Sequence, residues 1–340
     1  MNIHRGMVLV EYKGVMIFAE VTDGKPAPIT GELLGAGRRL AGELGEELSV
    51  IIAGSEIAKI AAELAISGAD KIYAIDDPLL QDYLTDSFTA VVEKVCRIAN
   101  PRILLMGHTT IGRDLAPAAA FRMGTAAATD CIALDIDDMN QQLLMTKPIY
   151  GGNARAVYTM ETFPQIATVR AKAMNAITPD SSRKGKIMNI PAGINQNTIR
   201  TKVIEKVVEE EKGVKLEEAA VIVTGGRGIG GAEGFKQLEE LAKLLKGAVG
   251  ASRTACDNGW VKDTMQIGLT GKIVAPEVYI AVAVSGTTQH LAGCSGARNI
   301  IAINKDPDAN IFNEARYGVV GDWKKVVPAF EKKAKEILGK

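Results

Sequence analysis

The chain has 340 residues, about two ordinary domains, and 47% of them are hydrophobic, enough for a sizeable core. Forty basic and 40 acidic side chains give a formal net charge of zero, and only 5% of residues are aromatic. This balance argues against nucleic acid as a partner. No apolar run reaches transmembrane length and MNIHRGMVLVEYKGV lacks the apolar core of a signal peptide, so we expect a cytoplasmic protein without membrane insertion.

Cysteine and histidine are too few and too scattered to suggest a metal site. Cys96, Cys131, Cys256 and Cys294 form no C-x-x-C pair, and the chain holds only three histidines. We therefore expect no metal centre and no disulfide framework, but free thiols in a reducing compartment.

The first half alternates short β-rich runs with segments of helical periodicity. This alternation predicts an α/β domain with a mainly parallel sheet. Beyond Gly124 the pattern changes to short strands and tight turns, which predicts an antiparallel edge at 143–146, 154–158 and 165–170. The earlier strands are expected at 15–18, 48–52, 72–75 and 103–106, and the helices at 33–44, 57–66 and 83–99.

A second α/β unit begins near Ala219. Residues 174–202 are polar, contain two prolines and lack a clear period, which favours an inter-domain connection. We expect a first domain at 1–190, a linker at 191–218 and a second domain at 219–340. Its strands are predicted at 220–223, 248–251, 278–284, 300–303 and 319–320, and its helices at 235–245 and 323–338.

The string GGRGIGG sets Gly226, Gly228 and Gly231 in G-x-G-x-x-G spacing between a strand and a helix. Such a turn holds a pyrophosphate and suggests an NAD(P)-dependent dehydrogenase. The acidic residue expected about 20 positions later is missing, because the next strand ends in Ser252-Arg253, and no Tyr-x-x-x-Lys pair occurs. A dinucleotide phosphate site, a non-redox nucleotide-binding module and a structural turn all stay open.

Four polar segments lie at or near strand ends in the second unit. Ligands of open α/β sheets bind outside the carboxyl ends of the strands, so these segments predict a binding crevice. Arg253 can stack on a ring or pair with an anion, Thr270 can donate to a ring nitrogen, and His290 can donate to a carbonyl. No nucleophile with its base is visible, which favours a cofactor holder over a bond-making enzyme. The segments are Ser252-Arg253, QIGLTGK at 266–272, SGTTQH at 285–290 and INKDP at 303–307.

The segments SRTACDNGWV, QIGLTGKIVAPEVYIAVAVSGTTQHLAG and IAINKDPDANIF resemble the C-terminal FAD domain of electron-transfer flavoprotein α subunits. GELLGAGRRLA, GRDLAPAAAFRMGTAAATD and PIYGGNARA resemble the first domain of that family. The resemblance implies an electron carrier with a doubly wound FAD-binding second domain and a first domain that packs on a β subunit. It also implies redox partners such as an acyl-CoA dehydrogenase, or NADH acting through the β subunit. The EYKGV start resembles that of α subunits from electron-bifurcating complexes.

The family pattern also implies individual contacts with FAD. It places Arg253 over the isoalloxazine, Thr270 near N5 and His290 near the C2 carbonyl. Leu269, Thr287 and Thr288 depart from the family pattern around the ring, so they bear on the flavin potential and are counted in the site. The other expected contacts are Arg227, Ser252, Ile267, Gly268, Ser285, Gly286, Gln289, Asn304, Asp322 and the adjacent Trp323.

Overall fold

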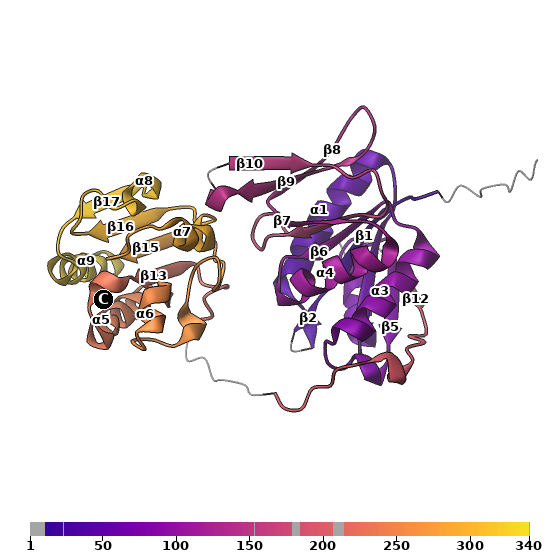
Figure 1. Ribbon diagram of the computed structural model, residues 1–340, viewed down its shortest axis with the longest axis horizontal. Helices are drawn as coiled ribbons and strands as arrows, with labels where there is room; N and C mark the ends of the chain where they lie inside the picture. Colours follow the sequence, from indigo (N-terminus) through magenta and orange to yellow (C-terminus); the bar gives the residue numbers. More distant parts are fainter. Residues whose placement is uncertain (1–10, 23, 153, 179–183, 207–213, 340) are drawn as a thin grey trace, which may run out of the picture. The chain divides into compact units, whose positions relative to one another are not determined.

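The computed structural model describes residues 11–22, 24–152, 154–178, 184–206 and 214–339, which form two compact units (Figure 1). The first unit comprises Met1–Pro148 and Arg155–Lys206. The second comprises Ile149–Ala154 and Val207–Lys340. Among the described residues, no helix has the length and apolar character that a membrane span requires.

The first unit is built on a seven-stranded sheet in the order β12-β5-β4-β1-β6-β11-β7, in which every neighbouring pair of strands is parallel. Its central strands are short apolar runs with every residue buried, as expected where helices cover both faces of a sheet. The expected parallel α/β domain is thereby confirmed. The strands are β1 Val15–Ala19, β4 Leu48–Gly54, β5 Lys71–Asp76, β6 Ile103–Gly107, β7 Ala127–Cys131, β11 Gln165–Val169 and β12 Lys186–Asn189.

Two pairs of helices cover the faces of this sheet. The helices α1 (Pro28–Leu44) and α2 (Ala58–Ile66) bury Leu33 and Leu64 in one apolar cluster. On the other face, α3 (Thr85–Ala99) and α4 (Thr110–Met123) share a second cluster. Short elements complete the unit: β2 (Val21–Thr22), β3 (Lys25–Pro26), and the 3-10 turns η1 (Pro78–Leu80) and η3 (Gln196–Thr198).

The antiparallel strands are not at the edge of the main sheet, where the sequence placed them. The strands β8 (Ala133–Ile136), β9 (Leu143–Ile149) and β10 (Ala154–Tyr158) form a separate three-stranded sheet, in which β8 and β9 are antiparallel. The segment expected at 165–170 is β11, a parallel strand between β6 and β7. All five of its residues are buried, which fits an internal strand rather than an edge.

The polar stretch expected to connect the domains belongs to the first unit as far as Lys206. Within it, β12 adds a parallel edge strand to β5, and Ala192 is buried in the cluster under α3. Arg200 pairs with Asp86 at 2.6 Å, which ties the stretch to the start of α3. The boundary therefore differs from the expected linker at 191–218, and residues 207–213 of that linker lie outside the described residues.

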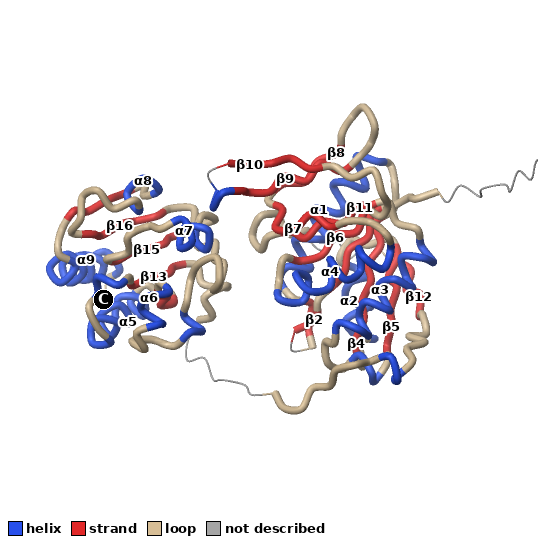
Figure 2. Tube along the Cα trace, in the orientation of Figure 1, coloured by secondary structure: helices blue, strands red, loops and turns tan. Residues whose placement is uncertain are grey.

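The second unit contains a five-stranded parallel sheet in the order β14-β13-β15-β16-β17. Helices lie on both of its faces (Figure 2), which confirms the doubly wound arrangement. One face packs against α5 (Ala232–Leu244), α6 (Arg253–Asp257) and α9 (Trp323–Leu338), and the other against α7 (Thr288–Cys294) and α8 (Ile311–Glu314). The strands are β13 Val221–Gly225, β14 Ala248–Ala251, β15 Val278–Val282, β16 Ile300–Asn304 and β17 Tyr317–Val320.

Candidate cofactor-binding site

The strand order of the second sheet creates a switch point between β13 and β15. After β13 the chain crosses through α5 to β14 on one side, and it then returns to β15 on the other side of β13. Connections that leave in opposite directions open a crevice outside the carboxyl ends of the two strands, which is where open α/β sheets bind ligands.

The structure brings the predicted residues to this same edge. Hydrogen bonds link neighbouring strand ends: the Gly226 amide donates to Val282 O at 2.9 Å, and the Ser252 amide to Gly225 O at 3.0 Å. One group of predicted residues follows each strand, namely Arg227 after β13, Ser252-Arg253 after β14, 285–290 after β15, Asn304 at the end of β16 and Asp322-Trp323 after β17.

The QIGLTGK turn extends this edge beyond β14. Gln266 bridges to Ala251, and the Leu269 amide donates to Gln289 O at 2.7 Å, so the turn lies against the start of α7. Ile267 is buried, whereas the Thr270 side chain is exposed and its Oγ1 accepts a bond from Gln266 Nε2 at 2.9 Å. The Thr270 hydroxyl therefore keeps its proton to donate.

The SGTTQH turn requires glycine at its second position. Gly286 has a φ of +78°, and a Cβ there would lie 2.3 Å from Ile311 N. The Ile311 amide donates to Ser285 O at 3.1 Å, which ties the turn to α8. Thr287 is the N-cap of α7, yet its side chain makes no capping bond, and Thr288 and Gln289 are exposed. The polar groups of this turn are thus free to meet a ligand.

His290 is the buried member of the set, with only 6% of its surface exposed. Its Nε2 lies 2.9 Å from the Tyr279 hydroxyl, while Nδ1 has no hydrogen-bond partner of acceptable geometry among the described residues. Burial lowers the pKa of His290 to about 4, against a smaller opposing contribution from the Ile267 backbone. The imidazole is therefore neutral near pH 7 and offers one donor and one acceptor.

Two arginines place positive charge at the edge. Arg227 lies exposed in the glycine turn η4 (Arg227–Ile229), and α5 begins beyond that turn without a side-chain cap. The Arg253 side chain is 69% exposed, and its Nε lies 3.4 Å from Asp257 Oδ2. An exposed pair of this kind is weak, so the guanidinium can turn toward an anion or a ring.

Three predicted residues have structural contacts of their own. Asn304 donates through Nδ2 to Val284 O at 2.8 Å, and Asp322 caps α9 by accepting from the Lys324 amide at 3.0 Å. The indole of Trp323 donates to Gly228 O at 3.2 Å. These bonds hold the strand-end loops in place. That the three residues also contact a cofactor stays a prediction.

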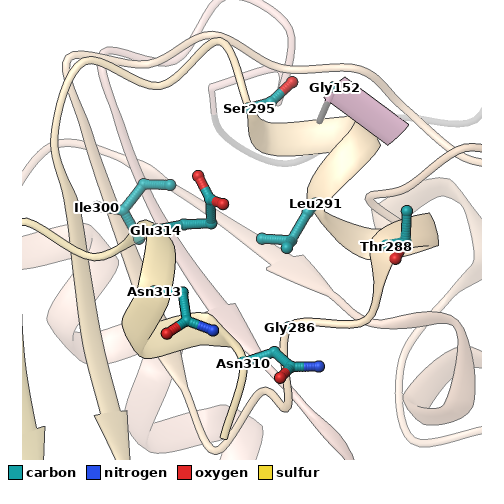
Figure 3. Close-up of a pocket in the computed structure, with 9 residues that line it drawn as sticks. All are labelled: Gly152, Gly286, Thr288, Leu291, Ser295, Ile300, Asn310, Asn313 and Glu314. Atoms are coloured by element: carbon teal, nitrogen blue, oxygen red, sulfur yellow. The ribbon is translucent and has the colours of Figure 1, made fainter. Parts of the chain in front are cut away.

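A hollow of about 190 Å³ lies between α7 and α8, beside Gly286 and Thr288 (Figure 3). This is smaller than the roughly 300–1,000 Å³ of typical ligand pockets, so it can take only a small group. Its other lining residues were not predicted, because they surround no recognisable motif: Gly152, Leu291, Ser295, Ile300, Asn310, Asn313 and Glu314.

Tyr279 is the contact of His290 that the sequence did not reveal. It lies in the apolar run of β15, which indicates packing alone, and its only signal is a phenol hydroxyl in an otherwise apolar strand. Within the described part of the chain, no group of three His, Cys, Asp or Glu side chains is placed to hold a metal.

Comparison with known proteins assigns both units to one family. The electron transfer flavoprotein domain matches residues 15–194, and the electron transfer flavoprotein FAD-binding domain matches residues 215–295. The chain is 43% identical to the electron transfer flavoprotein subunit alpha of Thermoanaerobacterium thermosaccharolyticum, over 96% of this chain and 99% of that protein. It is 41% identical to the same subunit of Megasphaera elsdenii (98% and 99%) and 42% identical to protein FixB of Clostridium saccharobutylicum (98% and 99%). The chain therefore belongs to the electron-transfer flavoprotein α-subunit family, with an FAD-binding second domain.

Proposed function

We propose that this chain carries electrons on an FAD held at the carboxyl edge of the second sheet, between a donor dehydrogenase and a further redox partner. The supporting observation is the concentration of exposed or unpartnered polar groups at that edge: two arginines, the Thr270 hydroxyl, the SGTTQH turn and the orphaned Nδ1 of His290. Together they suit a flat ring with carbonyl edges joined to a diphosphate.

The residues present fit FAD on two structural grounds. A buried ring nitrogen without a partner is costly, so His290 Nδ1 fits a ligand carbonyl. The helices α5 and α6 both begin at this edge without a side-chain cap, which leaves backbone N–H groups for phosphate oxygens. Arg227 and Ser252 would hold the phosphate part, and Arg253, Thr270 and His290 the ring.

The cofactor supplies the redox chemistry, because a bound flavin accepts and releases electrons. The protein's part is to bind the ring and to tune it. Arg253 would favour negative charge on the ring, and Thr270 would donate to a ring nitrogen. Leu269, whose side chain is 58% exposed, would cover part of the ring with an apolar surface.

The first unit would serve as the docking surface for a β subunit, since the subunit-alpha name of its relatives implies a companion chain. An acyl-CoA dehydrogenase, or NADH acting through the β subunit, would supply the electrons. The resemblance of the EYKGV start to bifurcating complexes extends the proposal to electron bifurcation. The free thiols of all four cysteines support a cytoplasmic location, because thiols stay reduced in that compartment.

An NAD(P)-dependent dehydrogenase and a non-redox nucleotide-binding module are the competing functions. The dehydrogenase hypothesis rests on the GGRGIGG turn, but β14 is followed by Ser252 and Arg253, where a ribose-binding acid would be required. An arginine at this position suits a ligand that gains negative charge better than a ribose hydroxyl.

The test is the flavin content of the co-purified α and β chains. We expect a yellow one-to-one heterodimer that dithionite bleaches and that a dehydrogenase with its substrate also bleaches. A colourless complex that binds NAD(P)H would favour the dehydrogenase. A colourless complex that binds only nucleotides would favour the non-redox module.

A further inference from the structure

Tyr279 and His290 form a buried polar pair inside the second unit. Tyr279 lies on β15 with none of its surface exposed, and it reaches out of the sheet to the imidazole on α7. The hydroxyl lies 2.9 Å from Nε2, and the two ring centroids are 6.2 Å apart. The Tyr279 side chain, fixed on a central strand of the sheet, thus holds the ring of His290 through this contact.

The direction of this hydrogen bond follows from the groups around it. Burial keeps the tyrosine protonated by raising the pKa of Tyr279 well above its ordinary value. If Nε2 carried the proton, the phenol proton would need another acceptor. Thr224 and Cys294 also lie beside the phenol. Thr224 Oγ1, however, makes no hydrogen bond of acceptable geometry, and the Cys294 thiol donates to His290 O at 3.7 Å. The phenol proton is therefore best placed on Nε2, and Nδ1 then carries the single proton of the neutral ring.

The start of α7, which carries this N–H, lies against the QIGLTGK turn. A Cβ on Gly268 would be 3.0 Å from Gln289 O and 3.6 Å from His290 Cα, so only glycine allows the turn to approach α7 this closely. Thr270 lies two residues further along the same turn. The unpartnered Nδ1–H thus belongs to the region where the ring of the cofactor is expected.

We propose that Tyr279 is a positioning residue, which holds His290 as the neutral Nδ1–H tautomer so that this N–H donates to a carbonyl oxygen of the flavin. The inference rests on the proposed function for the flavin, but its first half concerns residues of this chain alone. Tyr279 acts through His290 and needs no contact with the cofactor.

The experiment uses the α–β complex with 15N-labelled histidine, in which the α chain contributes only His4, His108 and His290. The His290 signals are assigned with a His290→Gln variant. We expect the wild-type shifts of the Nδ1–H tautomer. In Tyr279→Phe, which removes only the hydroxyl, we expect a mixture of tautomers or Nε2–H.

The flavin potential provides the second readout. Tyr279→Phe should lower the potential in the same direction as His290→Leu, which removes the donor, and by no more, because a donor to the flavin carbonyl stabilises the reduced ring. The double variant should match His290→Leu alone. The control is Tyr73→Phe, which removes a buried tyrosine hydroxyl from the first unit and should change neither readout.

The proposal for Tyr279 would be overturned by an Nε2–H tautomer of His290 in the wild type, or by an unchanged tautomer in Tyr279→Phe. So would a changed tautomer with an unchanged potential, or additive effects in the double variant. A wild-type complex without flavin would instead overturn the proposed function, while the tautomer measurement would still test the Tyr279–His290 pair.

Discussion

The two units carry similar sheets but differ at the carboxyl edges of their strands. Both sheets are parallel, and polar side chains gather where the strands end. In the first unit these side chains pair with one another. The Thr109 hydroxyl donates to the Glu20 carboxylate at 2.7 Å, and His108 Nδ1 lies 2.8 Å from Thr168 Oγ1. Arg170 donates two hydrogen bonds to the Asp130 carboxylate, at 2.8 and 2.7 Å.

At the corresponding edge of the second unit, most of the polar groups are exposed or lack partners, and Asn304 is a buried, hydrogen-bonded exception. Arg227 and Arg253 are exposed, and among the described residues His290 Nδ1 has no hydrogen-bond partner of acceptable geometry. A polar strand end is therefore not by itself a binding site. Unused hydrogen-bonding capacity distinguishes a ligand-binding sheet edge from one whose polar side chains only stabilise the fold.

The largest effect is expected at the tightest turn of the second edge. Gly286→Ala would force a side chain into left-handed backbone against Ile311 N, and strain and overlap together should destabilise the second unit by about 4 kcal/mol. We expect the complex to lose its FAD, as measured by urea unfolding and flavin absorbance. Gly259→Ala is the matched control, because Gly259 also has positive φ but open space around it, and it should cost only about 1 kcal/mol. Equal effects at the two positions would contradict the steric argument.

At the strand ends of the first unit, the buried Glu20 should instead make the free energy of unfolding depend on pH. Burial raises the pKa of Glu20 from 4.5 to about 7, against the lowering effect of the Thr109 hydrogen bond. The folded state then holds a proton that the unfolded chain releases. The contribution of protonated Glu20 to the free energy of unfolding is at most about 3 kcal/mol. It is fully present below pH 4.5 and is lost as the pH rises through about 7.

Glu20→Gln keeps an oxygen for Thr109 but cannot ionise. We expect the variant to lack this loss of stability and to be more stable than the wild type at pH 8, as urea unfolding at several pH values would show. Glu161→Gln makes the same chemical change at an exposed position and should leave the pH profile unchanged. A wild-type profile in Glu20→Gln would show that Glu20 is already ionised in the folded state.

The Arg170–Asp130 pair tests whether the first edge is structural. Both side chains are mostly buried, at 13% and 23% exposed, so Arg170→Ala should cost about 2 kcal/mol by leaving Asp130 without its partner. Flavin content and potential should not change. Arg298→Ala removes the exposed ion pair with Glu277 and should cost less than about 0.5 kcal/mol. A loss of FAD in Arg170→Ala without loss of folded protein would mean that the first edge contributes to the site.

Much of the fold could be predicted because its central strands are continuous apolar runs between helices. The expected helix at 323–338 matches α9, whose amphipathic pattern is complete in sequence. The strand β12 was missed because KIMN is half polar and becomes a strand only by pairing with the edge of β5. The buried strand β11 was assigned to an antiparallel edge because it follows a run of short strands and tight turns.

The loops that form the site could be predicted from the sequence, but the hydrogen bonds between them could not. Glycines and polar residues after strands indicate where ligand-facing turns lie, and the parallel topology brings them to one edge. Hydrogen bonds between elements do not follow from spacing. The Tyr279–His290 pair could not be predicted, because it depends on how β15 and α7 pack. The cap that Asp322 gives α9 is local, since aspartate directly before a predicted helix is a common N-cap.

The smallest effect on stability is expected at Arg253. Its pair with Asp257 is exposed on both sides, so Arg253→Ala should change the free energy of unfolding by less than about 0.5 kcal/mol. The flavin should respond more strongly. A unit charge about 4 Å from a reduced ring contributes at most about 4 kcal/mol at an effective dielectric of about 20, and solvent screens it further.

A quarter of that energy would lower a one-electron potential by about 40 mV in Arg253→Ala, as a spectroelectrochemical titration can measure. Arg253→Lys should recover part of the shift, since it returns the charge without the planar guanidinium. Asp257→Asn separates the two roles of the arginine. If Arg253 served only its ion pair, Asp257→Asn would reproduce the effect of Arg253→Ala. If Arg253 is the counter-charge of the ring, Asp257→Asn should leave the potential unchanged or raise it, because the guanidinium is released toward the flavin. Wild-type potentials in a folded, FAD-loaded Arg253→Ala protein would remove the arginine from the site.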